Sequence, residues 1–126
     1  MTLIDADQSS RRVIGCAIEV HKTLGPGLLE SIYEAALCLE LRQVGLRFDR
    51  QPQFPVIYKG QLLDLNLRPD LIVEDSLIVE IKSLQAILPV HEAQLQTYMK
   101  LSAIPTGLLL NFNEPLMKDG IRRRLL

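Results

Sequence analysis

The feature that most constrains the fold is a pair of extended segments, residues 62–73 and 77–82, joined by a very short turn. Apolar and polar side chains alternate along the first segment, a period typical of a β-strand. Its two faces are Leu65, Leu67, Pro69, Leu71 and Val73 on one side, and Asp64, Asn66, Arg68, Asp70 and Ile72 on the other. Because residues 74–76 (Glu-Asp-Ser) favour a turn, we expect the two segments to pair as antiparallel strands.

The length of that turn decides which side chains face each other. Glu80 and Lys82 are two residues apart on the second strand, so both point to the same face of the sheet. A three-residue loop over 74–76 places Asp70 opposite Glu80. A two-residue loop would place Asp70 opposite Ile81, on the wrong face. A site that contains both carboxylates therefore requires a loop of odd length or a bulge.

The chemistry of this cluster favours a divalent metal. Two carboxylates on neighbouring strands repel each other and are costly to bury, and a divalent cation relieves that cost. Mg²⁺ prefers a few carboxylates together with water and phosphate oxygens, and the backbone carbonyl of Ile81 is a further candidate ligand. Lys82 adds a positive charge that can orient an attacking water and offset charge in the transition state. The alternative is an ordinary solvated strand face, since Glu-x-Lys pairs commonly form cross-strand ion pairs.

The rest of the pattern predicts helices and further strands around this hairpin. Apolar residues recur at helical spacing from Gln8 to Leu24 and from Leu29 to Val44, with Gly-Pro-Gly at 25–27 between the two helices and Gly45 as the second cap. Further elements are predicted at 54–58 (strand), 89–102 (helix), 106–112 (buried strand) and, after a turn at 118–120, an edge strand. The predicted order, α-α-β-β-β-α-β without repeats or linkers, indicates one α/β domain over residues 1–126, with residues 1–10 as a loosely ordered N-terminus.

Composition limits the classes of function. The chain has 126 residues, of which 48% are hydrophobic and 23% charged, as is typical of a globular domain with its own core. A net charge of -1 argues against a general affinity for polyanions. Basic residues do cluster locally, at 11–12, at 42, 47 and 50, and at 122–124. Each cluster fits an ordinary solvated surface, but such a patch can also bind phosphates.

The cysteines and the N-terminus indicate the cellular compartment. Cys16 and Cys38 lie in apolar helical patterns without metal-ligand spacing, so we expect buried reduced thiols. The acidic, polar start MTLIDADQSS does not resemble a signal peptide. No apolar run approaches the roughly 18 residues of a membrane span. We therefore expect a cytoplasmic protein that does not enter a membrane.

Three motifs occur in the order found in a known family. Pro69-Asp70, followed after nine residues by Glu80-Ile81-Lys82, resembles the signature of the PD-(D/E)XK nuclease superfamily. Gly27 to Tyr33 spells G-x-x-E-x-x-Y, the string that names the GxxExxY family of small bacterial proteins within that superfamily. Gln94 to Tyr98 matches the Q-x-x-x-Y motif that follows the catalytic lysine in related exonuclease domains. With further similarity at 89–95, 111–112 and 118–123, the resemblance extends from Val13 to Arg124.

The resemblance implies a fold, a cofactor and a set of site residues. The implied fold is a single-domain α/β nuclease fold, with a central mixed sheet of about four to five strands flanked by helices. The implied catalytic residues are Glu30, Asp70, Glu80, Lys82, Gln94 and Tyr98. The ligands of an Mg²⁺ or Mn²⁺ ion would be Asp70, Glu80 and Glu30, together with the carbonyl of Ile81.

Several of these residues also have ordinary structural interpretations. The spacing i, i+3, i+4 and i+7 places four residues on one helical face, namely His91, Gln94, Leu95 and Tyr98. A Gln amide and a phenol there can bind a phosphate or hold Lys82 in place, but Tyr98 also fits a core position with a satisfied hydroxyl. His91 fits a structural or surface role, and Tyr33 fits packing rather than catalysis. Glu30, in the first turn of its helix, can alternatively complement the helix dipole.

The function implied is a metal-dependent nuclease that hydrolyses phosphodiester bonds of DNA. The alternatives are a non-catalytic nucleic-acid-binding or assembly module that retains the fold, and a phosphodiesterase acting on RNA. The chain contains no Trp and only 5% aromatic residues, so base stacking would contribute little and phosphate contacts most of the binding. Expected partners are nucleic acid, DNA in the first place, with a homodimer or a larger complex as further assembly states.

Overall fold

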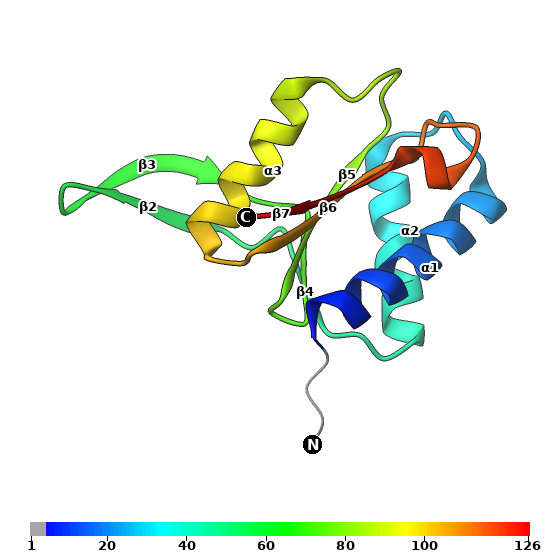
Figure 1. Ribbon diagram of the computed structural model, residues 1–126, viewed down its shortest axis with the longest axis horizontal. Coiled ribbons are helices and arrows are strands. Elements are labelled where there is room, and N and C mark those ends of the chain that lie inside the picture. The colour runs from blue at the N-terminus through cyan, green and yellow to red at the C-terminus, as the bar shows by residue number, and fades with distance from the viewer. Residues whose placement is uncertain (1–4) are drawn as a thin grey trace.

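The computed structural model describes residues 5–126 as a sheet with helices on both faces and a hairpin that projects to one side (Figure 1). The helices are α1 (Ala6–Leu24), α2 (Glu30–Gln43) and α3 (Pro89–Ser102), with a short 3₁₀ helix η1 (Met117–Gly120). The strands are β1 (Phe48–Arg50), β2 (Phe54–Tyr58), β3 (Gln61–Leu67), β4 (Leu71–Val73), β5 (Leu77–Lys82), β6 (Thr106–Asn111) and β7 (Ile121–Leu125). The main sheet has the order β1-β4-β5-β6-β7, and β2 and β3 form a separate hairpin.

The main sheet is mixed. β5 pairs antiparallel with β4 and parallel with β6, and the two outer pairs, β1–β4 and β6–β7, are antiparallel. The chain leaves β5, passes through α3 and returns as β6, the crossover that parallel neighbours require. β5 and β6 are covered on both faces, which explains their almost continuous apolar runs. A five-stranded mixed sheet flanked by helices confirms the predicted α/β fold.

Side chains of the central strands alternate between two apolar clusters. Leu71, Val79 and Leu110 pack in the cluster that α1 and α2 cover. Ile78 and Leu109, at the alternate positions, pack against α3 on the other face. The sheet therefore separates side chains by odd and even position, and the same alternation determines the face on which each candidate site residue lies.

The first helix begins earlier than its periodicity predicts. Asp5 caps α1 by accepting a hydrogen bond from the backbone N–H of Gln8 at 2.8 Å, as Asp commonly does at a helix start. Residues 6–10, expected in a loosely ordered N-terminus, instead form the first turns of this helix, and residues 1–4 lie outside the described residues. The predicted stop is observed, since Gly25 has a φ of 71° that favours glycine.

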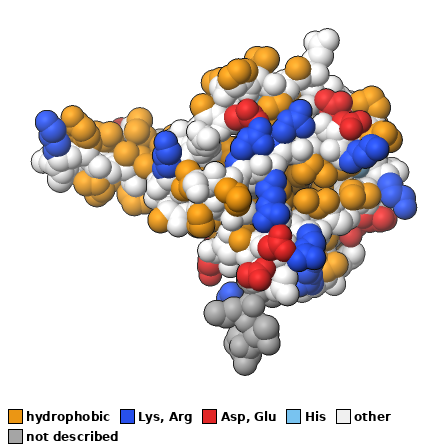
Figure 2. All heavy atoms as spheres, viewed as in Figure 1, with side chains coloured by type: hydrophobic (Ala, Val, Ile, Leu, Met, Phe, Trp, Pro, Cys, Tyr) orange, Lys and Arg blue, Asp and Glu red, His pale blue; other side chains and the backbone are white. Residues whose placement is uncertain are grey.

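The single strand predicted over 62–73 is wrong, because the structure divides it. β3 ends at Leu67 and β4 begins at Leu71, and the two strands belong to different sheets. Pro69 accounts for the break, since it has no N–H for the ladder and restricts the residue before it. The grouping of one face across the break is also wrong: Leu71 is buried in the core, whereas Leu65 is exposed on the hairpin. Figure 2 shows hydrophobic side chains along that projecting hairpin.

β1 was not predicted from the sequence. Its three residues, Phe48–Arg50, are too short to show a period and carry two charged side chains. β1 pairs antiparallel with β4, with Arg50 opposite Leu71. The predicted order α-α-β-β-β-α-β therefore lacks β1 and the division of residues 62–73, whereas the 3₁₀ turn and the edge strand β7 occur where a turn and an edge strand were expected.

Two smaller expectations concern the thiols and the membrane. Cys16 and Cys38 are both buried and free, as predicted for reduced core cysteines. Within residues 5–126, none of the helices combines the length and the apolar character needed to span a membrane.

Gly120→Ala is expected to destabilise the protein by about 2–4 kcal/mol, because there is no room for a methyl group. A Cβ at Gly120 would lie 2.1 Å from the backbone oxygen of Asn111, which is the last residue of β6 and is held in place by the sheet. Gly15→Ala is the matched control: it lies in α1 with nothing within 4 Å of an added Cβ, and should stabilise the helix by about 0.5–1 kcal/mol. Thermal unfolding compares the two, and equal melting temperatures would contradict the packing argument.

Candidate active site

The antiparallel register of β4 and β5 brings two carboxylates together. The three residues 74–76 link the strands, and the pairs Leu71–Val79 and Val73–Leu77 place Asp70 opposite Glu80, as the odd-length loop predicts. Two hydrogen bonds join the pair: the Asp70 N–H donates to Glu80 Oε1 at 2.8 Å, and the Ile81 N–H donates to Asp70 Oδ2 at 2.7 Å. Each carboxylate thus has one oxygen held by a backbone amide.

The two carboxylates are in an environment that disfavours their charged forms. Glu80 is only 3% exposed, and burial together with the nearby charge of Asp70 raises its pKa to about 8. Burial also raises the pKa of Asp70 to about 6, and the charge of Glu34 adds to the effect. The bonds from Ile81 and Asp70 amides and the charge of Lys82 offset only part of this cost. A cation beside the pair would therefore be strongly stabilising.

Lys82 links the pair to α3. Its Nζ lies 3.8 Å from Glu80 Oε2 and donates a hydrogen bond to Gln94 Oε1 at 2.9 Å. Gln94 Nε2 in turn donates to the Tyr98 hydroxyl at 3.4 Å, so four of the predicted site residues form a continuous chain. Tyr98 is buried in the α3 cluster, and burial followed by the charge of Glu80 raises its pKa. Tyr98 is therefore both a core residue and a neighbour of the candidate site.

Glu30 lies at the margin of this cluster. It is the first residue of α2, where a negative charge also complements the helix dipole. Its side chain is exposed, and among the described residues it forms no hydrogen bond or ion pair. Its charge nevertheless contributes to the raised pKa of Glu80, after burial and Asp70. The structure therefore places Glu30 near the pair without bringing it into contact.

Two other motif residues have structural partners. His91 Nδ1 accepts the backbone N–H of Leu88 at 2.8 Å, so His91 caps the start of α3. Tyr33 is fully buried, stacks on Phe112 at 4.6 Å between ring centroids, and donates from its hydroxyl to the carbonyl of Gly25 at 2.5 Å. Both arrangements agree with the structural interpretations of these residues.

The structure adds three residues near the site that were not among the predicted site residues. Glu34, on α2, is 5% exposed, and its Oε2 accepts from Arg50 Nε at 2.7 Å and from Gln51 Nε2 at 3.1 Å. The backbone N–H of Gln51 donates to the carbonyl of Asp70 at 2.8 Å. Glu34 follows Glu30 by four residues, a spacing that places both on one helical face and was available as a signal. Arg50 was noted only as a member of a basic cluster, and Gln51 had no signal, because neither β1 nor the turn after it was predicted.

The donor set fits a hard divalent cation bound mainly by water and substrate. Within residues 5–126, no group of three or more His, Cys, Asp or Glu side chains is arranged to hold a metal. Mg²⁺ does not require one, since it commonly takes one or two carboxylates and keeps several waters. The two backbone amides bond to Glu80 Oε1 and Asp70 Oδ2, so Asp70 Oδ1 and Glu80 Oε2 are the oxygens that can bind the ion. The Ile81 carbonyl points to the same edge of β5 as its N–H, toward Asp70, because a strand residue directs both groups to one side.

The arginine clusters differ in their surroundings. Arg11 and Arg123 both bind Asp7, at 2.5 and 3.0 Å, and Arg124 is paired with Glu92, so these positive charges are partly neutralised. Of the three clusters, the one at 42, 47 and 50 includes Arg50, which bonds to the buried Glu34 and is influenced by the charge of Asp70.

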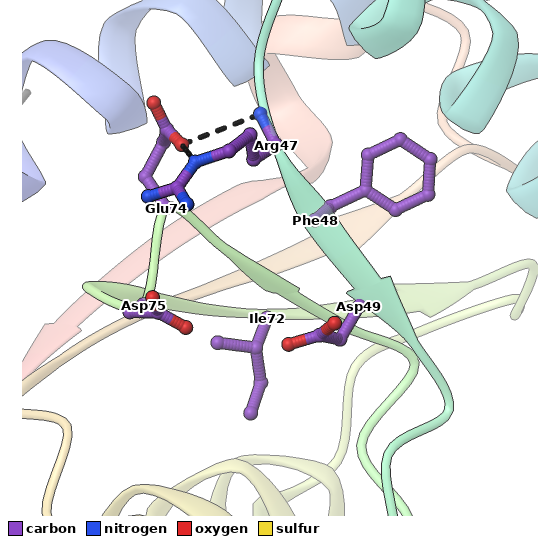
Figure 3. A pocket seen from close by; sticks show the side chains of 6 residues that line it. All are labelled: Arg47, Phe48, Asp49, Ile72, Glu74 and Asp75. Atoms are coloured by element: carbon purple, nitrogen blue, oxygen red, sulfur yellow. Dashed lines mark hydrogen bonds and ion pairs between the residues drawn. The ribbon is translucent and has the colours of Figure 1, made fainter.

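A separate pocket of about 280 Å³ is formed by β1, β4 and the turn that follows β4. It is lined by Arg47, Phe48, Asp49, Ile72, Glu74 and Asp75. Figure 3 shows the Arg47 backbone N–H and Nε both directed at Glu74, at 3.3 and 3.2 Å. None of the predicted site residues lines this pocket, so the carboxylate pair, and not this hollow, is the candidate active site.

Comparison with known proteins agrees with this geometry. The family model of the PD-(D/E)XK nuclease superfamily matches residues 7–124. The chain therefore belongs to the PD-(D/E)XK nuclease superfamily. The comparisons with curated proteins and with solved structures found no match.

Proposed function

We propose that the protein is a divalent-metal-dependent nuclease that hydrolyses phosphodiester bonds of DNA. The observation that carries the proposal is the β4–β5 register, which sets Asp70 against Glu80 with Lys82 on the same face. This arrangement occurs in a chain of the PD-(D/E)XK nuclease superfamily. An ordinary structural ion pair would not bury two neighbouring carboxylates whose pKa values are both raised.

Each residue has a distinct part in the proposed reaction. Asp70, Glu80 and the Ile81 carbonyl would hold the ion, with Glu30 completing its ligands directly or through water. A bound Mg²⁺ or Mn²⁺ would lower the pKa of a coordinated water and offset charge on the phosphate. Lys82 would orient the attacking water and stabilise the transition state, as its ammonium group points at the carboxylate cluster.

Two α3 residues support Lys82 in this scheme. Gln94 Oε1 accepts a hydrogen bond from the Lys82 ammonium group, which has three N–H donors. This bond restricts the long and flexible lysine side chain. Tyr98, buried and bonded to Gln94, restricts the glutamine in turn. The two are thus positioning residues whose loss would lower the rate through Lys82.

We further propose membership of the GxxExxY family within the superfamily. The support is the complete string from Gly27 to Tyr33, the Q-x-x-x-Y string from Gln94 to Tyr98, and their order around the central signature. In the structure Tyr33 bonds to the carbonyl of Gly25 and to the N–H of Leu28, so the string closes the loop that leads into α2 and Glu30.

Lys82→Ala is expected to lower Mn²⁺-dependent cleavage by about a hundredfold or more, because the positive charge beside the reacting phosphate is lost. Purified wild type and variant are incubated with single-stranded, duplex and branched DNA and with RNA of the same sequences. Lys100→Ala, an exposed lysine on the same helix as Gln94, is the matched control and should cleave like the wild type.

The same panel decides between the proposed function and its alternatives. Equal, metal-independent cleavage by wild type and Lys82→Ala would reject the proposed active site. Cleavage of RNA alone would replace the DNA substrate with RNA. Binding of DNA without cleavage under any metal would favour the non-catalytic module.

A further inference from the structure

The Glu34–Arg50–Gln51 cluster has a geometry that the proposed function does not use. A carboxylate buried as deeply as Glu34 is costly unless it is paired, and both of its observed donors act on one oxygen, Oε2. Both donors belong to the same short segment at the end of β1. A helix residue therefore holds the end of an edge strand in place.

Gln51 connects this anchor directly to the carboxylate pair. Its backbone has a φ of 51°, a left-handed conformation that a non-glycine residue rarely adopts and that carries strain. Two bonds maintain it, from its side chain to Glu34 and from its backbone N–H to the carbonyl of Asp70. The strained residue thus bridges the buried anchor and the residue that opposes Glu80.

Arg50 is held at one end only. Its Nε is bound to Glu34, and among the described residues no group accepts a hydrogen bond from its two η nitrogens. The side chain remains 43% exposed, and it lies opposite Leu71, the residue after Asp70. The bond to Glu34 raises the pKa of Arg50, and the charge of Asp70 contributes further, which places the guanidinium within electrostatic reach of the site.

We propose that Arg50 binds a phosphate group of the nucleic acid beside Asp70, and that Glu34 is the residue that positions it. A guanidinium whose Nε is fixed presents its two η nitrogens as a preoriented fork, a geometry that matches phosphate oxygens. The positive charge also compensates the negative charge that Glu34, Asp70 and Glu80 would otherwise present to an anionic substrate. The inference rests on the proposed function in that the ligand is taken to be nucleic acid.

Arg50→Gln is expected to weaken binding of fluorescein-labelled duplex DNA about tenfold, measured by anisotropy in Ca²⁺ so that no cleavage is required. The slope of log affinity against log salt should fall by about one, as for the loss of one phosphate contact. Mn²⁺ affinity by calorimetry should stay within about threefold of the wild type. Arg50→Lys retains the charge and should keep the slope while losing part of the affinity.

Arg47→Gln is the matched control. Arg47 also binds a glutamate Oε2 through Nε, but it is 77% exposed and lines the separate pocket formed by β1, β4 and the turn after β4. It should leave both affinity and slope near those of the wild type. Equal losses for Arg47→Gln and Arg50→Gln would overturn the proposal, because a general charge effect would then explain both.

A double-mutant cycle tests the part assigned to Glu34. Glu34→Gln alone should weaken DNA binding several-fold, and adding it to Arg50→Gln should weaken binding no further, because Glu34 acts through Arg50. Multiplied losses would overturn the positioning role. Melting temperatures of all variants identify any loss that comes from unfolding.

Failure of this inference differs from failure of the proposed function. If the wild type cleaves DNA but Arg50→Gln binds it like the wild type, the inference fails and the function stands. If the wild type binds DNA with the expected Arg50 dependence but never cleaves it, the inference stands and the catalytic proposal fails. If the wild type binds neither DNA nor RNA, both fail.

Discussion

Asp70→Asn is expected to abolish Mn²⁺ binding and to lower the rate of DNA cleavage by about a thousandfold. In the wild type the Ile81 N–H donates to Asp70 Oδ2 at 2.7 Å, and an Asn side-chain oxygen can accept the same hydrogen bond. The substitution therefore keeps the shape of the site and removes one negative charge. Removing that charge also relieves the repulsion that contributes to the raised pKa of Glu80. The metal-free variant should therefore be at least as stable as the wild type at pH 8. Calorimetry with Mn²⁺, cleavage rates and melting temperatures measure the three effects.

Asp75→Asn is the matched control for that experiment. Asp75 lies in the turn between β4 and β5 with a φ of 52°, a conformation that Asn tolerates as well as Asp does. The substitution makes the same chemical change a few residues away and should leave metal binding and cleavage unchanged. A wild-type cleavage rate in Asp70→Asn would show that the pair is only a structural contact.

The metal-free protein is expected to lose stability as the pH rises from about 5 to 8. The pKa of Glu80 is raised from 4.5 to about 8 and that of Asp70 from 3.8 to about 6, so the folded state retains protons that the unfolded state has already released. Where the folded state binds more protons, the free energy of unfolding falls with increasing pH. The stability that the pair contributes is therefore fully present below its unfolded-state pKa values of 3.8 and 4.5, and it is lost as the pH rises through the folded-state values of about 6 and about 8. The expected decrease is a few kcal/mol, or on the order of 10 °C in melting temperature.

Two further measurements assign this pH dependence to the pair. Glu80→Gln removes the group with the most strongly raised pKa, and its melting temperature should vary much less between pH 5 and pH 8. Mn²⁺ should stabilise the wild type more at pH 8 than at pH 5, because the ion competes with protons for the same oxygens. An unchanged pH dependence in Glu80→Gln would assign the effect to other groups.

Helix boundaries were well predicted because their cues are local. Pro89 begins α3, which ends at Ser102 as expected, and the glycines after α1 and α2 mark their ends. The contact between Asp70 and Glu80 was also predictable, since strand alternation and loop length determine register without knowledge of the rest of the fold. In both cases the deciding interactions connect residues near one another in the chain.

The parts that were missed depend on residues far apart in sequence. Whether residues 62–73 continue as one strand depends on which sheet each half joins, and β4 finds its partners in β1 and β5, whereas β3 pairs with β2. Glu34 is buried only because Arg50 and Gln51, 16 and 17 residues later, supply its hydrogen bonds. No periodicity within α2 distinguishes such a glutamate from an exposed one.

The sequence by itself determined the fold class, the nuclease superfamily and the chemical nature of the central pair with its lysine, because these depend on patterns and motifs within short segments. Only the tertiary structure decided how buried Glu80 is, that the charge of Glu30 acts on it, and which arginine bonds to the buried Glu34. Burial and charge coupling are properties of the whole packed molecule, since they arise when elements distant in the chain exclude water from the same place.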